Sequence, residues 1–236
     1  MGCVLRPTLV LAVVIAAAIA TSAAPSSGAQ SACVATNARF ATVDGVRLQG
    51  AVVGRGTTGV VFAHQVAGDR CQWLDFAREV ASDGYRVLVF DMRGYGASSG
   101  SANVRPDRDV AAAAAELRRR GARKVILVGA SMGGTGVVAA APGIRPAVSG
   151  VVDLSGPVGF GGVNALPAAL KLRRPALFVA GRDDGDFAAA TRALYRAAAT
   201  KDKKLVIAPT SWHGVDLVSL PAVKRVVLDF IRRVGA

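Results

Sequence analysis

The sequence has few histidines, few acidic side chains and few aromatic rings for its length. It contains 2 His, 6% aromatic residues, and 16 Asp and Glu against 29 Lys and Arg in 236 positions. The histidines and cysteines do not occur at the short spacings that zinc sites use, so we expect no metal site and no cofactor. The basic residues are scattered and no base-reading motif accompanies them, which argues against a specific nucleic-acid partner.

Charged residues are also scarce, and this excludes a disordered chain. Only 19% of the residues are charged whereas 52% are hydrophobic, which is enough apolar surface to offset the entropy lost when a backbone is ordered. The length fits one sizeable domain with an appendage. The formal net charge of +13 predicts a basic surface that attracts anionic material of the cell envelope, and it does not specify the substrate or the oligomeric state.

The first 29 residues have the layout of a secretory signal peptide. Arg6 precedes an uninterrupted apolar run over 9–20, and small residues follow as far as Ala29. The run is shorter than the roughly 20 residues that cross a bilayer as a helix. We therefore predict a signal peptide over 1–29, one domain over 30–236, and a secreted or extracytoplasmic location. Lipid anchoring at Cys33 is the less favoured alternative, because this cysteine lies far from the apolar run.

Two cysteines remain once the signal peptide is removed. They are Cys33 and Cys71, since Cys3 lies in the removed segment. Two cysteines in an exported protein predict one disulfide, here between the mature amino terminus and the region after the first core strand. Two unpaired thiols are the alternative, because a sequence does not show whether two Cα atoms come within bridging distance.

Short apolar runs alternate with helical segments along the rest of the chain. Residues 40–53 alternate polar and apolar side chains around Asp44-Gly45, which is typical of a β-hairpin. Apolar runs that indicate strands buried on both faces occur at 60–63, 87–90, 125–128, 148–154, 176–179 and 205–207. Helical signals cover 69–82, 107–120, 132–141, 186–199 and 218–234. This order predicts an α/β fold with a mostly parallel sheet, helices on both faces and an amino-terminal antiparallel hairpin.

The nucleophile pattern G-x-S-x-G occurs twice, around Ser98 and around Ser131. Ser131 directly follows one apolar run and directly precedes a helical segment, as the strand-turn-helix elbow requires, whereas Ser98 lies in a loop. A serine hydroxyl needs a base, and His64 and His213 are the available histidines. His213 follows the last strand, at the sheet edge where Ser131 is expected. We therefore predict His213 as the base that activates Ser131.

A carboxylate is also needed, because it orients the imidazole and stabilises the cation that forms. Asp183 and Asp184 follow the run 176–179 and lie between Ser131 and His213 in the chain. Either of them can serve. Asp153, at the end of another strand, is the reserve candidate.

Three motifs together resemble those of the α/β-hydrolase superfamily. They are the elbow at 129–134, the Asp-x-Arg-Gly-x-Gly-x-Ser loop at 91–98 and the segment 181–184. The likeness covers nearly all of 40–236 and implies the α/β-hydrolase fold, with the small serine esterases and the dienelactone-hydrolase-like branch as the most similar. Dienelactone hydrolase uses a cysteine nucleophile, whereas this chain has Ser131. The spacing usual in the superfamily favours Asp184 as the acid.

The resemblance also implies an oxyanion hole made by the backbone N–H groups of Gln65 and Met132, with His64 shaping the loop. Gln65 stands where relatives commonly carry glycine. Only twenty residues separate Leu154 from Pro175, so a large cap domain cannot fit there and an open cleft is expected. The implied function is an exported serine hydrolase that cleaves small or polymer-attached carboxylic esters through an acyl-enzyme. A peptidase or thioesterase of the same fold, or a non-catalytic envelope-binding module, is the alternative.

Overall fold

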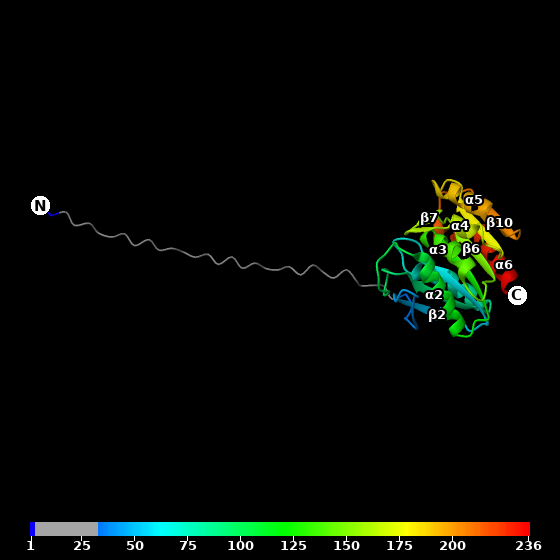
Figure 1. The fold of residues 1–236 in the computed structure, drawn as a ribbon, viewed down its shortest axis with the longest axis horizontal. Helices are drawn as coiled ribbons and strands as arrows, with labels where there is room; N and C mark the ends of the chain where they lie inside the picture. Colours follow the sequence, from blue (N-terminus) through cyan, green and yellow to red (C-terminus); the bar gives the residue numbers. More distant parts are fainter. Residues whose placement is uncertain (3–32) are drawn as a thin grey trace. The chain divides into compact units, whose positions relative to one another are not determined.

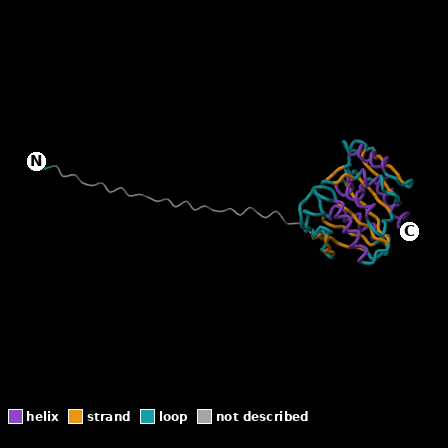
Figure 2. The backbone as a smooth tube through the Cα atoms, in the orientation of Figure 1, coloured by secondary structure: helices purple, strands orange, loops and turns teal. Residues whose placement is uncertain are grey.

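The apolar runs form the interior of one large sheet. The computed structural model describes residues 1–2 and 33–236 of the chain. Within this part, eight strands follow the order β1-β2-β4-β3-β5-β6-β9-β10 (Figures 1 and 2). The pairs β1·β2 and β2·β4 are antiparallel, and the remaining neighbours run parallel. The strands are β1 (Ala38–Ala41), β2 (Arg47–Val53), β3 (Thr58–Ala63), β4 (Arg86–Asp91), β5 (Lys124–Ala130), β6 (Gly150–Leu154), β9 (Ala176–Gly181) and β10 (Lys203–Ala208).

Helices connect the parallel strands and cover the sheet. The α-helices are α1 (Leu74–Ser82), α2 (Pro106–Arg119), α3 (Met132–Ala140), α4 (Leu166–Ala169), α5 (Phe187–Ala197) and α6 (Pro221–Gly235). Short 3-10 helices are η1 (Arg70–Trp73), η2 (Ala141–Gly143) and η3 (Gly214–Ser219), and β7 (Gly159–Phe160) pairs with β8 (Val163–Asn164) in a small separate hairpin.

Side chains of each strand alternate between two hydrophobic cores, one on each face of the sheet. In β3, Val61 and Ala63 pack with residues of α2, α3 and α5, whereas Val60 and Phe62 pack with residues of α1 and α6. Burial on both faces removes the apolar side chains of the central strands from water, which is the main stabilising term of such a sheet. The predicted fold class is therefore confirmed: the sheet is mostly parallel, has helices on both faces and carries an antiparallel hairpin at its amino-terminal side.

The elements differ from the sequence-based prediction at a few boundaries. The segment expected as one helix over 69–82 begins as η1 and continues as α1. The last helix begins at Pro221, because proline suits the first helical turn, where its missing N–H group costs no hydrogen bond. The hairpin β7–β8 and the one-turn helix α4 were not expected, since elements of two to four residues are too short for hydrophobic periodicity to reveal them.

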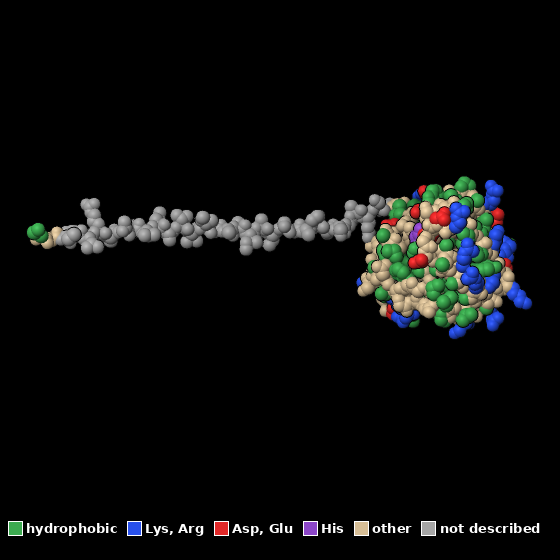
Figure 3. Space-filling view, turned by 90° about the horizontal axis from the view of Figure 1, so that it is seen from above, with side chains coloured by type: hydrophobic (Ala, Val, Ile, Leu, Met, Phe, Trp, Pro, Cys, Tyr) green, Lys and Arg blue, Asp and Glu red, His purple; other side chains and the backbone are tan. Residues whose placement is uncertain are grey.

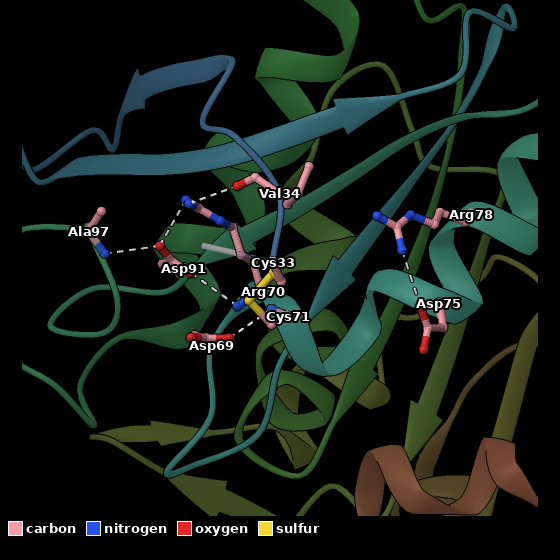
Figure 4. Close-up of a disulfide and its surroundings, with 9 residues drawn as sticks. All are labelled: Cys33, Val34, Asp69, Arg70, Cys71, Asp75, Arg78, Asp91 and Ala97. Carbon is pink, nitrogen blue, oxygen red and sulfur yellow. Dashed lines mark hydrogen bonds and ion pairs between the residues drawn. A yellow bond between two sulfur atoms is a disulfide. The ribbon is translucent and has the colours of Figure 1, made fainter. Parts of the chain in front are cut away.

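Cys33 and Cys71 are joined by a disulfide, with their Cα atoms 5.7 Å apart (Figure 4). The bond attaches the segment before β1 to η1. Beside it, Arg70 donates one guanidinium hydrogen bond to the buried carboxylate of Asp91 (3.1 Å) and another to the carbonyl oxygen of Val34 (3.3 Å). The disulfide and the hydrogen bond to Val34 thus hold the same two segments together, and the ion pair attaches η1 to the end of β4.

The predicted signal peptide, including its cleavage position, lies outside the described residues. Within 1–2 and 33–236, no helix combines the length and the apolarity that a membrane crossing requires. The residues from Cys33 onward form one compact unit.

Candidate active site

The carboxyl ends of the parallel strands meet at one edge of the sheet, and the polar side chains that follow these ends gather there. Gln65 follows β3, Ser131 follows β5 and Ser155 follows β6. Asp184 and His213 come from the loops after β9 and β10. Five separate segments therefore contribute to one region, and each is positioned by a strand buried in the two cores.

Ser131 occupies a strained turn between β5 and α3. Its backbone has φ +50°, a left-handed conformation that a residue with a side chain rarely adopts. The turn is tight: a Cβ atom added to Gly129 would lie 2.2 Å from the carbonyl oxygen of Gly133, and one added to Gly133 would lie 2.3 Å from that of Ala63. Glycine at both positions is what allows the strand to turn directly into the helix and to present Ser131 at its start.

His213 and Asp184 are in direct contact. The Nδ1 atom of His213 lies 3.0 Å from both carboxylate oxygens of Asp184. Asp184 is 7% exposed, and the buried hydroxyl of Ser155 donates a 2.7 Å hydrogen bond to its Oδ2 atom. The ring of Phe187 packs on the imidazole, with centroids 4.2 Å apart. These contacts orient the imidazole so that its Nε2 atom remains for another partner.

The other two acidic candidates lie elsewhere. Asp183 is exposed and its carboxylate pairs with Arg182 (3.3 Å), so of the two neighbouring aspartates only Asp184 contacts His213. Asp153 is fully buried beneath the start of α3, where its Oδ1 atom accepts the N–H of Gly156 (2.9 Å). Burial raises the pKa of Asp153 to about 7, and the hydrogen bond from Gly156 offsets part of this shift.

Of the two residues whose amides are expected to form an oxyanion hole, Gln65 lines the pocket and Met132 is adjacent to the pocket residue Ser131. Met132 follows Ser131 directly as the first residue of α3, and Gln65 lies in the loop after β3. The N–H group of Gln65 has no hydrogen-bond partner in the described part of the chain. A free amide at this place can donate to a developing negative charge.

His64 fixes the orientation of the Gln65 loop. It is fully buried, its Nε2 atom accepts the N–H of Met92 (2.9 Å), and its Nδ1 atom lies 2.8 Å from the carbonyl oxygen of Gln65. Since Nε2 is an acceptor, the proton resides on Nδ1 and is donated to that carbonyl. Burial lowers the pKa of His64, which keeps the ring neutral in this arrangement.

The side chain of Gln65 joins two loops of the site that are far apart in sequence. Its Oε1 atom accepts the N–H of Val215 (2.9 Å), two residues after His213. A Cβ atom added to Gly214, which has φ +56°, would lie 2.0 Å from the same oxygen. The Gln65 side chain therefore links the candidate oxyanion loop to the His213 loop.

A pocket of about 440 Å³ opens above these residues. Its polar lining includes Ser131, His213 and Gln65, and its apolar lining includes Val66, Phe160 and Phe187. Phe160 comes from the small hairpin β7–β8, which occupies the position where a cap would be inserted. The pocket thus combines a serine hydroxyl, an imidazole and an apolar wall, the composition expected of a site for a small organic substrate.

Several of these positions were not singled out from the sequence. Ser155, Phe160 and Phe187 contact the site, yet the sequence offers only one signal for them, which is that Ser155 is a polar residue directly after a buried strand. Ser98, the serine of the second G-x-S-x-G pattern, lies outside the pocket lining: its hydroxyl donates to the carbonyl oxygen of Asp91 (2.6 Å) and accepts the N–H of Gln49 (2.9 Å). No cluster of three metal-ligating side chains occurs in the part of the chain that the structure covers.

The chain has the α/β-hydrolase fold. A model of that fold matches residues 59–165, which include β3 to β6 and the Ser131 turn. The fold that the three motifs imply is therefore confirmed, and the match includes the motifs at 91–98 and 129–134. Among solved structures, an esterase of Pyrococcus furiosus is similar with a TM-score of 0.72 and 18% identity, covering 84% of this chain and 90% of that chain. A dienelactone hydrolase of Anabaena variabilis is similar with a TM-score of 0.69 and 22% identity, covering 84% and 97%.

A curated relative matches a shorter stretch. The dihydrolipoyllysine-residue acetyltransferase component of the acetoin cleaving system of Cupriavidus necator is 34% identical over 144 residues, which is 61% of this chain. The match spans only 38% of that relative's length. At such identities the solved structures establish the fold, whereas the reaction has to be argued from the site.

Proposed function

We propose that this protein is a serine hydrolase that cleaves carboxylic esters through an acyl-enzyme. The observation that carries the proposal is the contact of the Asp184 carboxylate with Nδ1 of His213, in a pocket that His213 shares with Ser131. A carboxylate on Nδ1 keeps the proton on that atom and leaves Nε2 available as a base in the pocket that contains Ser131. The esterase and dienelactone hydrolase among its structural neighbours are consistent with this chemistry.

In the proposed mechanism, His213 takes the hydroxyl proton of Ser131 while Oγ attacks the ester carbonyl carbon. The amides of Gln65 and Met132 stabilise the oxyanion that forms, and the imidazolium then gives its proton to the departing alcohol. Water, activated by the same imidazole, releases the acid and regenerates the serine. Asp184 keeps the imidazole oriented throughout, and the Ser155 hydroxyl donates a hydrogen bond to its Oδ2 atom.

The pocket favours esters with a compact acyl group. Phe160 and Phe187 form part of its apolar wall, and the segment between β6 and β9 contains only a short hairpin and one helical turn. No cap covers the pocket within the described residues, so a long acyl chain would extend into water instead of being enclosed. We propose a small or polymer-attached ester as the substrate, with secretion of the mature chain as the setting.

Active-site labelling tests the proposal. Purified mature protein is treated with a fluorophosphonate probe, together with the variants Ser131→Ala and Ser98→Ala. Both serines occur in G-x-S-x-G, so Ser98→Ala is the matched control. We expect labelling of the wild type and of Ser98→Ala, no labelling of Ser131→Ala, and a fall in kcat for a nitrophenyl ester of at least about 10³-fold in that variant.

The same preparations distinguish the alternatives. Faster turnover of amide or thioester analogues than of the nitrophenyl ester would indicate a peptidase or a thioesterase. A wild-type protein that is folded by circular dichroism but neither reacts with the probe nor hydrolyses any of the three substrates would contradict the proposal and favour a binding module.

A further inference from the structure

The net positive charge of the folded part lies at one edge of the sheet. We define the basic edge as the surface at the amino ends of the parallel strands. It contains the last four residues of each helix that precedes such a strand, the connection after that helix and the first residue of the strand. The turn before β3 and the carboxyl end of α6 also belong to it. At the amino-terminal ends of the parallel strands these segments lie side by side. The basic edge comprises 54–58, 79–86, 116–124, 137–150, 166–176, 194–203 and 232–236.

Nearly all of the charge imbalance belongs to this surface. The basic edge contains sixteen Lys and Arg against four Asp and Glu, whereas the other residues from Cys33 onward contain twelve of each. The excess of positive charge over the folded part is thus carried by the basic edge alone. On the face of the domain that Figure 3 shows, several Lys and Arg side chains (blue) gather toward one side.

Geometry places the basic edge opposite the candidate active site. Ser131, Asp184 and His213 follow the carboxyl ends of their strands, whereas the basic edge precedes the amino ends of the same parallel strands. Strand β5 runs from Lys124, its first residue, to Ala130, directly before Ser131. The two regions are therefore separated by the full length of the sheet.

The basic edge also contains an exposed leucine. Leu170 is 64% exposed, and the exposed side chains of Lys171 and Arg173 lie next to it in the connection between α4 and β9. An apolar side chain among cations is the combination that binds an anionic bilayer, because the leucine enters the interface while the cations neutralise headgroups. The aromatic rings of the basic edge, Tyr85 and Tyr195, are half-buried, so it has no exposed ring on which a nucleic-acid base could stack.

We propose that the basic edge docks on an anionic phospholipid bilayer and that the pocket then faces away from the membrane. The cations come from seven segments spread across one end of the domain, which suits a planar array of headgroups. In this orientation the enzyme would act on soluble or polymer-attached esters near the membrane and not on the lipid beneath it. Only the statement about which esters the docked enzyme acts on rests on the proposed function.

Vesicle sedimentation tests the proposal on the mature chain. The vesicles contain phosphatidylcholine with 30% phosphatidylglycerol, or phosphatidylcholine alone. We expect binding to the first at low salt, loss of binding as salt rises, and none to the second. Emission from the exposed Trp212, next to His213, should not be quenched by brominated lipid, and hydrolysis of a soluble nitrophenyl ester should continue on the vesicles.

Two variants of equal net charge separate the basic edge from the overall charge. The first variant replaces Arg123, Lys171 and Lys201 by Ser. All three are exposed and make no ion pair with other described residues. We expect this variant to bind on the order of 100-fold more weakly than the wild type. The control replaces Arg47, Arg192 and Arg225, which are also exposed and lie outside the basic edge. The control should bind within about 3-fold of the wild type.

Leu170→Ser should weaken binding about 5-fold, whereas Val104→Ser, at an exposed valine outside the basic edge, should not. Equal losses in the two triple variants would overturn the proposal, since overall charge would then explain the binding. Retention on heparin without vesicle binding would overturn it in favour of a polyanion. Because binding is measured without substrate, an inactive enzyme that still docks would contradict the proposed function and leave this inference standing.

Discussion

Gln65 contributes to the candidate site through its backbone and its side chain. The backbone N–H has no hydrogen-bond partner within the described residues, while Oε1 accepts the N–H of Val215 (2.9 Å). The side chain therefore couples the loop that would stabilise the oxyanion to the loop that positions His213. A glycine at this position, as many relatives carry, would leave the two loops without this link.

We predict that Gln65→Met lowers kcat for a nitrophenyl ester about 5-fold while KM changes little, because one hydrogen bond that positions His213 is lost and the backbone donor remains. Gln65→Glu retains an acceptor for Val215 and should preserve the position of the His213 loop. Gln72→Met, at an exposed glutamine outside the pocket lining, is the control. A larger rise in KM than fall in kcat for Gln65→Met would indicate that this side chain contacts the substrate instead.

At the scale of elements, three contacts fix the position of η1. The disulfide ties it to Cys33, the Arg70 guanidinium ties it to Asp91, and the Asp69 carboxylate accepts the N–H of Cys71 (2.7 Å) at its start (Figure 4). The loop between β3 and η1 contains Gln65. Anchoring of η1 therefore limits the movement of one wall of the pocket.

We predict that Cys33→Ser with Cys71→Ser lowers the free energy of unfolding by about 4 kcal/mol, the chain-entropy value for a loop of this length. Denaturant unfolding of the wild type with and without reductant, beside the double variant, measures the difference. The reduced wild type and the double variant should behave alike. No change upon reduction would mean that η1 is held by its ionic contacts without the disulfide.

At the scale of the whole molecule, stability depends on pH through a carboxyl group in the core. Burial raises the pKa of Asp153 from 3.8 to about 7, so the folded protein holds a proton that the unfolded chain releases in this interval. The stabilising contribution is fully present below a pH of about 4 and is lost as the pH rises through 7. The Oδ2 atom has no hydrogen-bond partner within the described residues, so the N–H of Gly156 on Oδ1 compensates only part of the charge of an ionised Asp153.

We predict that the free energy of unfolding of the wild type falls between pH 5 and pH 8 and that Asp153→Asn reduces this fall by a few kcal/mol, on the order of 1.4 kcal/mol per pH unit. Asparagine imitates the protonated carboxyl group and keeps an acceptor for Gly156. Asp75→Asn, at a fully exposed aspartate, should leave the pH dependence as it is. Parallel stability curves for the wild type and Asp153→Asn would show that Asp153 does not titrate in this range.

The charge distribution acts at the same scale, because cations at one end and a balanced surface around the pocket give the domain a preferred orientation toward anions. The sequence predicted a basic surface from the count of Lys and Arg alone. It did not predict that the excess gathers at the amino ends of the parallel strands, since residues as distant as Arg55 and Arg233 come together only when the sheet forms.

Much of the fold follows from local patterns. The run around Val61 and Phe62 predicts a strand buried on both faces, because alternate side chains must all find apolar partners. The turn at Ser131 is equally local, since small residues must surround it. Elements without a periodic pattern, such as the hairpin that carries Phe160, could not be predicted, because they are formed by contacts with the rest of the molecule.

The sequence by itself determined the alternation of strands and helices, the candidate serine and the candidate histidine, because each depends on neighbours within about ten residues. The tertiary structure alone decided that Asp184 and not Asp183 contacts His213, that Ser155 supports this carboxylate and that Gln65 reaches Val215. These contacts join segments that lie far apart in the chain. Their partners are chosen by how the sheet brings the loop ends together, which no local pattern encodes.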